Sequence, residues 1–131
     1  EWFMREADKG KIMPSSFTNT SKKIKIHGHC HQKSQASMTP VKRALSFPEH
    51  YEARLIPSGC CGMAGSFGYE HEHYDISMQV GELVLFKTVR SLDEETEIAA
   101  SGTSCRHQIK DGTGRRALHS IEVLFNALKE D

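Results

Sequence analysis

Three short apolar segments that alternate with helical segments constrain the fold of this chain most strongly. Ile24 and Ile26 alternate with lysines before His27, the segment YEARLI ends at Pro57, and EIAA precedes Ser101 and Gly102. Each of these patterns predicts a short strand. Helical spacing occupies residues 39–47 and 73–91 between the strands, and residues 103–112 and 115–130 after them. The sequence therefore predicts an α/β domain with three layers, in which helices flank a small, mostly parallel sheet.

The predicted helices are amphipathic. Residues 73–91 read as one long helix with an apolar face made of Ile76, Val80, Leu83 and Val84. We expect the closing helix to bury a stripe made of Leu118, Ile121, Leu124, Phe125 and Leu128. Gly112 is expected to end the helix before it, and residues 1–10 predict a short helix that stops at Gly10.

A cluster of unusual residues follows each predicted strand. The segment HGHCH covers residues 27–31, the segment GCCGMAGSFG covers residues 59–68, and GTSC covers residues 102–105. In a parallel sheet the carboxyl ends of the strands share one edge, and sites form there. We therefore expect Cys30, Cys60, Cys61 and Cys105 to converge in space, although they are far apart in the sequence.

The chemistry of these four cysteines points to a metal or to redox work. Gaps of 29 and 43 residues separate the cysteine segments, so a local zinc knuckle of the Cys-x-x-Cys type is excluded. A chain of 131 residues has no need of disulfide staples. Reduced cysteines are the expectation, and metal binding or thiol chemistry are their usual roles.

Glycines and histidines surround the cysteines. Backbone N–H groups of a glycine-rich turn stabilise thiolates or sulfides, and residues without side chains let a bulky inorganic group approach. This makes Gly59, Gly62 and Gly65 candidates for shaping a cofactor loop. Three histidines are candidates for supporting a ligand or a thiolate, namely His29, His31 and His107.

Other interpretations of the cysteines stay open at this point. Free cysteines are often small buried apolar residues. Adjacent cysteines are also a strained substitute for a dithiol–disulfide pair. The glycine segment has neither the GxGxxG order nor the Gly-Lys-Ser/Thr ending of a phosphate-binding loop.

Composition and charge exclude several classes of function. The 17 basic residues balance the 17 acidic residues, so no basic nucleic-acid-binding surface is indicated. No apolar run approaches the roughly 20 residues of a membrane helix, and no signal peptide opens the chain. Because the chain begins at Glu1 without a methionine, we expect a piece of a longer protein. In this interpretation residues 1–20 are a helix and linker from a preceding region, and residues 21–131 are a cysteine-rich domain.

The segments HGHCHQKS, SGCCGMAGSFG, GTSCRHQI and GRRALHSIEVL together resemble the cysteine-rich CCG domain. That family includes the cysteine-rich polypeptide of heterodisulfide reductase and the iron–sulfur subunits of glycolate oxidase and anaerobic glycerol-3-phosphate dehydrogenase. The resemblance covers residues 21–131, in the order of the family's motifs. It is greatest to the C-terminal part of FAD-linked oxidases that contain iron–sulfur centres. One departure is Gly102, which occupies the first position of the family's Cys-x-x-Cys, so this chain carries one thiol fewer.

The resemblance implies an iron–sulfur cluster held by Cys30, Cys60, Cys61 and Cys105, with zinc as the alternative metal. It implies electron transfer during oxidation of a D-2-hydroxy acid such as glycolate, lactate or 2-hydroxyglutarate. The alternatives are a zinc-stabilised or metal-free interaction module and a thiol–disulfide redox domain. No Cys-x-x-Cys-x-x-Cys run is present, so the isolated domain is not expected to oxidise a substrate by itself.

The resemblance also implies partners. These are the flavin domain of the parent protein, which would carry FAD, and its ferredoxin-like domain. A quinone or another electron carrier would accept the electrons. The expected location is the cytoplasm, with a peripheral position at the inner membrane face as the alternative.

Overall fold

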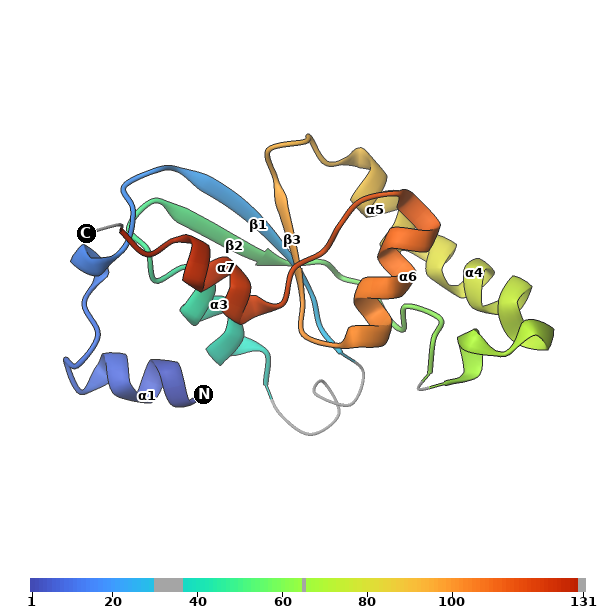
Figure 1. The fold of residues 1–131 in the computed structure, drawn as a ribbon, viewed down its shortest axis with the longest axis horizontal. Helices are drawn as coiled ribbons and strands as arrows, with labels where there is room; N and C mark the ends of the chain where they lie inside the picture. Colours follow the sequence, from blue (N-terminus) through green and yellow to red (C-terminus); the bar gives the residue numbers. More distant parts are fainter. Residues whose placement is uncertain (30–36, 65, 130–131) are drawn as a thin grey trace.

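A three-stranded parallel sheet organises the chain. The computed structural model describes residues 1–29, 37–64 and 66–129. Its strands are β1 (Lys22–His27), β2 (Tyr51–Leu55) and β3 (Glu97–Ala100), in the order β2-β1-β3. In register, Ile24 of β1 lies opposite Ala53 of β2 on one side and Glu97 of β3 on the other. All three strands therefore end at one edge of the sheet, as the sequence predicts (Figure 1).

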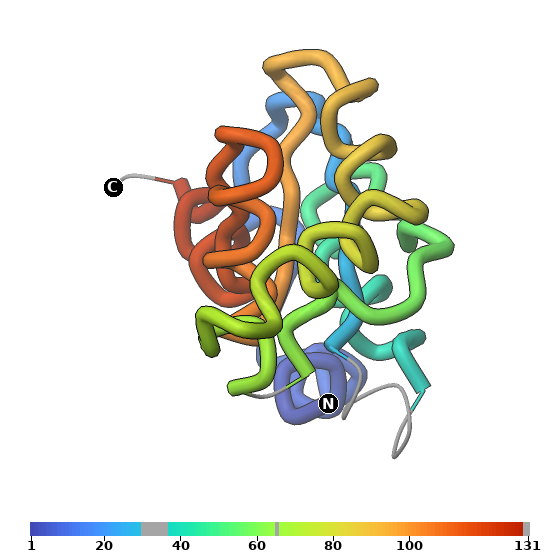
Figure 2. The backbone as a smooth tube through the Cα atoms, turned by 90° about the vertical axis from the view of Figure 1, so that its right-hand side faces the viewer, coloured from blue at the N-terminus to red at the C-terminus, as the bar shows by residue number. Residues whose placement is uncertain are grey.

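Helices cover both faces of this sheet (Figures 1 and 2). One face carries α1 (Trp2–Asp8), α3 (Thr39–Leu45) and α7 (Ser120–Asn126), and the other carries α4 (Tyr74–Leu83), α5 (Leu85–Ser91) and α6 (Thr103–Thr113). Short 3₁₀ turns lie at η1 (Pro14–Ser16), η2 (Phe67–Tyr69) and η3 (His71–His73). The predicted three-layer α/β class is confirmed. In the parts of the chain that the structure describes, every helix is too short or too polar to cross a membrane.

The core divides into one apolar cluster on each face of the sheet. On the α1 side, Phe3 meets Phe17 and Phe47 edge to face, with ring centroids 6.3 and 5.4 Å apart. On the other side, Phe86 is fully buried between Gly81 and Gly112. A Cβ atom at either glycine would lie 2.3 Å from the Phe86 ring. Small residues therefore let α4, α5 and α6 pack closely around one aromatic side chain.

This packing corrects two expectations about the middle of the chain. Gly112 does not end α6. It lies inside the helix, where its lack of a side chain makes room for the Phe86 ring. The helix ends at Gly114, whose φ of +75° is the left-handed conformation of a helix C-cap. The segment 73–91 forms two helices, because the backbone breaks at Val84 with φ −137° and ψ −50°.

The break also changes which side chains are buried. Of the predicted apolar face, Ile76 and Leu83 are 53% and 71% exposed, and Val84 is exposed as well. The residues of α4 and α5 that reach the core instead are Ser77, Gly81, Leu85, Phe86 and Val89. A single uninterrupted helix would carry the face of α4 through α5, and the turn at Val84 redirects α5 toward the sheet.

The stripe predicted for the closing helix is wrong for three of its five residues. Ile121, Phe125 and Leu128 are exposed, and Leu124 is buried beside Val123. The reason is that Leu118 belongs to an extended segment: its N–H donates to Ile98 O and its C=O accepts from Ala100 N–H, both at 2.8 Å. The helix begins only at Ser120, after His119 and Glu122 close a capping box.

Candidate metal site

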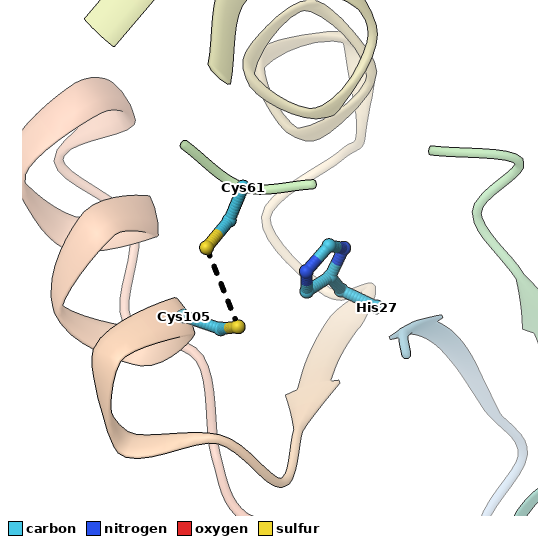
Figure 3. A group of neighbouring side chains, drawn as sticks. All are labelled: His27, Cys61 and Cys105. Atoms are coloured by element: carbon cyan, nitrogen blue, oxygen red, sulfur yellow. Dashed lines mark hydrogen bonds between the residues drawn. The ribbon is translucent and has the colours of Figure 1, made fainter. Parts of the chain in front are cut away.

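Three side chains from three strand ends meet on the α6 side of the sheet. His27 is the last residue of β1, Cys61 lies in the glycine loop that follows β2, and Cys105 lies in the first turn of α6 after β3. Their ligand atoms all lie within 4.8 Å of one another. Cys61 Sγ and Cys105 Sγ are 3.4 Å apart and share a hydrogen bond, and the His27 ring faces both (Figure 3). The predicted convergence of cysteines at the sheet edge is thus present for Cys61 and Cys105.

All three side chains are buried, with at most 2% of each exposed. His27 Nδ1 lies 2.8 Å from Ser58 Oγ, and this contact fixes the plane of the ring. The other ring nitrogen, Nε2, is buried and has no hydrogen-bond partner among the described residues. A buried polar atom without a partner is costly, and metal-bound histidines characteristically hydrogen-bond through their second nitrogen. This arrangement leaves Nε2 available as a ligand atom.

The electrostatics of the site favour a thiolate. The pKa of Cys61 is lowered to about 4, first because the Cys105 thiol hydrogen-bonds to it. His27 and the backbone N–H of Met63 lower this pKa further, while burial acts in the opposite direction. An ionised cysteine is the form that binds metals.

The donor set fits a single thiophilic metal ion. One imidazole nitrogen and two thiolate sulfurs are typical ligands of zinc and of iron. Two sulfurs, each ~2.3 Å from a tetrahedral ion, would be ~3.8 Å apart, which is ~0.4 Å more than the separation found here. Small adjustments of Cys61 and Cys105 would therefore bring both onto one ion.

The glycine loop that carries Cys61 is held by contacts to α4 and α6. Gly62 has a φ of +101°, and a Cβ atom there would lie 2.1 Å from Ser77 O. Gln108 of α6 donates from Nε2 to Ser77 Oγ at 2.8 Å. By contrast, Gly59 is exposed and has open space where a Cβ would stand. Of the two predicted loop glycines that the structure describes, Gly62 is the one whose lack of a side chain positions the cysteine.

The remaining predicted site residues lie in different surroundings. Cys60 is half-buried, and its sulfur accepts a hydrogen bond from Gly62 N–H at 3.3 Å, but it is not one of the three converging ligands. His107 is exposed, with Nδ1 2.8 Å from the Tyr69 hydroxyl. The predictions for Cys30, His31 and Gly65 lie outside the described residues.

His29 lies beside the site, and Gly102 makes room for it. A Cβ atom at Gly102 would lie 2.3 Å from His29 Cδ2 and 3.2 Å from Cys105 Sγ. The space that a side chain at position 102 would need is therefore occupied by the His29 ring. A cysteine at position 102 would require that ring to move.

His27 is the ligand candidate that the sequence pattern did not single out. The rule that sites form at strand ends directs attention to the cysteines and histidines that follow a strand. His27 is the last residue of β1 itself, so the rule did not select it. The alternation of side chains along β1 could have identified His27. Ile24 and Ile26 face the α1 side, and neighbouring residues of a strand point to opposite faces, so His27 faces the α6 side, where Cys105 lies.

Comparison with known proteins gives several relatives. One subunit of anaerobic glycerol-3-phosphate dehydrogenase from Escherichia coli is 28% identical over 127 residues, covering 97% of this chain and 31% of the relative. D-2-hydroxyglutarate dehydrogenase from E. coli is 33% identical over 106 residues, covering 78% of this chain and 10% of the relative. The enzyme of the same name from Pseudomonas putida is 29% identical over 131 residues, covering 95% and 12%.

The chain thus spans about a third of the first relative and about a tenth of the other two. No family model matches the chain, and no solved structure matches it. All three relatives are named as dehydrogenases or dehydrogenase subunits. Their similarity is consistent with the CCG-type domain that the cysteine motifs resemble.

Proposed function

We propose that this chain is an electron-transfer domain of a flavin-linked dehydrogenase, with an iron–sulfur group bound where His27, Cys61 and Cys105 meet. The observation that carries this proposal is the buried meeting, at the strand ends, of two thiols and an imidazole nitrogen that has no hydrogen-bond partner among the described residues. The substrate class that we propose is a D-2-hydroxy acid such as glycolate, lactate or 2-hydroxyglutarate, and the relative named D-2-hydroxyglutarate dehydrogenase supports the last of these.

In this function the chain's own residues hold and shield the metal group. Cys61 and Cys105 are the thiolate ligands, and His27 Nε2 is the third donor. Ser58 keeps the His27 ring in the orientation that directs Nε2 toward the two sulfurs. The burial of all three side chains keeps water away from the bound group. Iron bound there supplies one-electron chemistry, which links a two-electron flavin reaction to a downstream carrier.

The proposed cluster needs more than three ligands, and Cys60 and Cys30 are our candidates for the others. Cys60 adjoins Cys61 in the same loop and is half-buried. We propose that the parent protein supplies FAD and ferredoxin-like centres, and that a quinone or electron carrier receives the electrons. The location that we propose is the cytoplasm.

A second candidate is a structural zinc ion, and the site geometry favours it specifically. The Sγ–Sγ separation of 3.4 Å and the imidazole donor suit one tetrahedral ion with the three described ligands. In that case Cys60 would take no part. The chain would then be a metal-stabilised module for docking rather than for electron transfer.

Metal analysis of four variants separates these functions. The chain is purified without oxygen, and iron, zinc and acid-labile sulfide are measured per chain for wild type, His27→Ala, Cys61→Ser, Cys60→Ser and His50→Ala. His50 is an exposed histidine before β2 and serves as the matched control. We expect wild type and His50→Ala to hold iron and sulfide, and the other three variants to lose most of both.

The contradicting results are equally clear. Zinc without sulfide, retained in Cys60→Ser and lost in His27→Ala, would replace the electron-transfer function with the structural one. Metal content that is unchanged in Cys61→Ser would show that the converging residues are not the ligands.

A further inference from the structure

Among the described residues, the outer edge of β2 has no paired strand. The sheet order places β2 at one side and β3 at the other. The edge of β3 is covered, because Leu118 exchanges backbone hydrogen bonds with Ile98 and Ala100. No segment within residues 1–29, 37–64 and 66–129 pairs with the outer side of β2. A groove runs along that side instead, lined by Lys42 of α3, by Ser46 directly after that helix, and by the strand itself.

The ladder determines which backbone groups face this groove. Lys22 N–H donates to His50 O, and Ile56 N–H donates to Ile26 O. Because alternate residues of a parallel strand bond to the same neighbour, Glu52 and Arg54 also direct their backbone groups to β1. The backbone groups of Tyr51, Ala53 and Leu55 therefore point outward. Of these, only Tyr51 N–H has a partner within the described residues, the carbonyl of Pro48.

The side chains along this edge are complementary to themselves. In an antiparallel pairing centred on Ala53, Glu52 lies opposite Arg54 of a second copy, and Tyr51 lies opposite its Leu55. The Glu52 and Arg54 side chains are 52% and 67% exposed, and within the described part of one chain their ion pair is with each other. Leu55 is 40% exposed, on the same face of the strand as Tyr51. One register thus sets both charged pairs opposite each other and places each Leu55 beside the Tyr51 of the other copy, which is 8% exposed.

We propose that β2 pairs antiparallel with β2 of a second copy of this chain, with a two-fold axis at Ala53. Ala53 of each copy exchanges N–H and C=O hydrogen bonds with the other, and Leu55 N–H donates to the opposite Tyr51 C=O. Glu52 and Arg54 lie at the intervening positions, where side chains of paired strands are closest. The two sheets become one continuous sheet across an isologous interface. A strand of five residues is a small contact, so the dimer is weak and depends on concentration.

Charge exchange tests this pairing directly. Sedimentation velocity is measured up to about 1 mM chain, a range that reaches weak dimers. Variants are Glu52→Arg, Arg54→Glu and the double exchange, each checked for wild-type circular dichroism. Each single exchange sets like charges opposite each other, and we expect a dissociation constant raised roughly tenfold or more. The double exchange restores opposite charges at both positions, and we expect it to recover the wild-type value.

Ala53→Pro provides an independent test, because it removes an outward N–H that β1 does not use, and edge strands tolerate proline there. We expect this variant to fold and to be monomeric. A wild-type chain that is monomeric at every concentration would overturn the proposal, and it would indicate that another strand covers this edge. A dimer that survives both single exchanges, or is not recovered by the double exchange, would also overturn it.

Discussion

Replacing Gly62 by alanine should destabilise the fold through the loop that carries Cys61. The backbone φ of +101° is unfavourable for any residue with a Cβ and costs about 1–2 kcal/mol. The new Cβ would stand 2.1 Å from the carbonyl oxygen of Ser77, a backbone atom that cannot rotate away. Overpacking of this kind costs about 1–3 kcal/mol. Together we expect Gly62→Ala to lower the free energy of unfolding by about 2–5 kcal/mol.

Gly59→Ala is the matched control in the same loop. It has no heavy atom within 4 Å of the added Cβ, so we expect a change within about 0.5 kcal/mol. Urea unfolding followed by circular dichroism measures both variants. With a slope of about 1–3 kcal/mol per molar urea, the midpoint of Gly62→Ala should fall by ~0.7 M or more, beyond the change expected for its control. Equal midpoints for the two variants would refute the argument that Ser77 fixes this loop.

Two further predictions concern the thiolate of Cys61 and the hydrogen bonds of Arg115 to the loop before β3. Since the pKa of Cys61 is lowered to about 4, the thiolate stabilises the metal-free fold fully above the unfolded thiol pKa. This contribution decreases by up to ~1.4 kcal/mol per pH unit as the pH falls from ~8.5 and is lost near pH 4. The unfolding free energy of wild type should therefore fall more steeply with decreasing pH than that of Cys61→Ser, and parallel curves would contradict the prediction. Arg115 donates to Leu92 O at 3.1 Å and to Thr96 O at 2.7 Å. Arg115→Ala should cost about 1–3 kcal/mol because it leaves these carbonyls unpaired, and an unchanged melting temperature would exclude that role.

The layered fold could be predicted from the sequence because strand and helix periodicities alternate clearly. The placement of Cys61 and Cys105 followed from the same pattern, since parallel strands end at one edge. His27 was not selected as a candidate, because its proximity to Cys61 and Cys105 depends on which face of β1 it occupies relative to α6. The expectations for Cys30 and His31 stay predictions.

The errors in the helices have tertiary causes. The spacing of Ile121 and Phe125 is helical, but pairing of Leu118 with β3 delays the helix and sets which side faces the core. Gly112 carries the usual signal of a helix end, and its real role is contact with Phe86, a residue 26 positions earlier. Local patterns do not contain such contacts, which arise only when α4, α5 and α6 pack together.

The central claim is tested most directly by the visible absorption spectrum of the chain, purified without oxygen and recorded before and after reduction. The account predicts a coloured protein whose visible absorbance decreases with dithionite and returns on controlled oxidation, because an iron–sulfur centre is redox-active. The same sample of His27→Ala should be colourless or strongly bleached. A wild-type chain that is colourless, holds zinc in equal amount to protein and does not respond to dithionite would contradict electron transfer at this site.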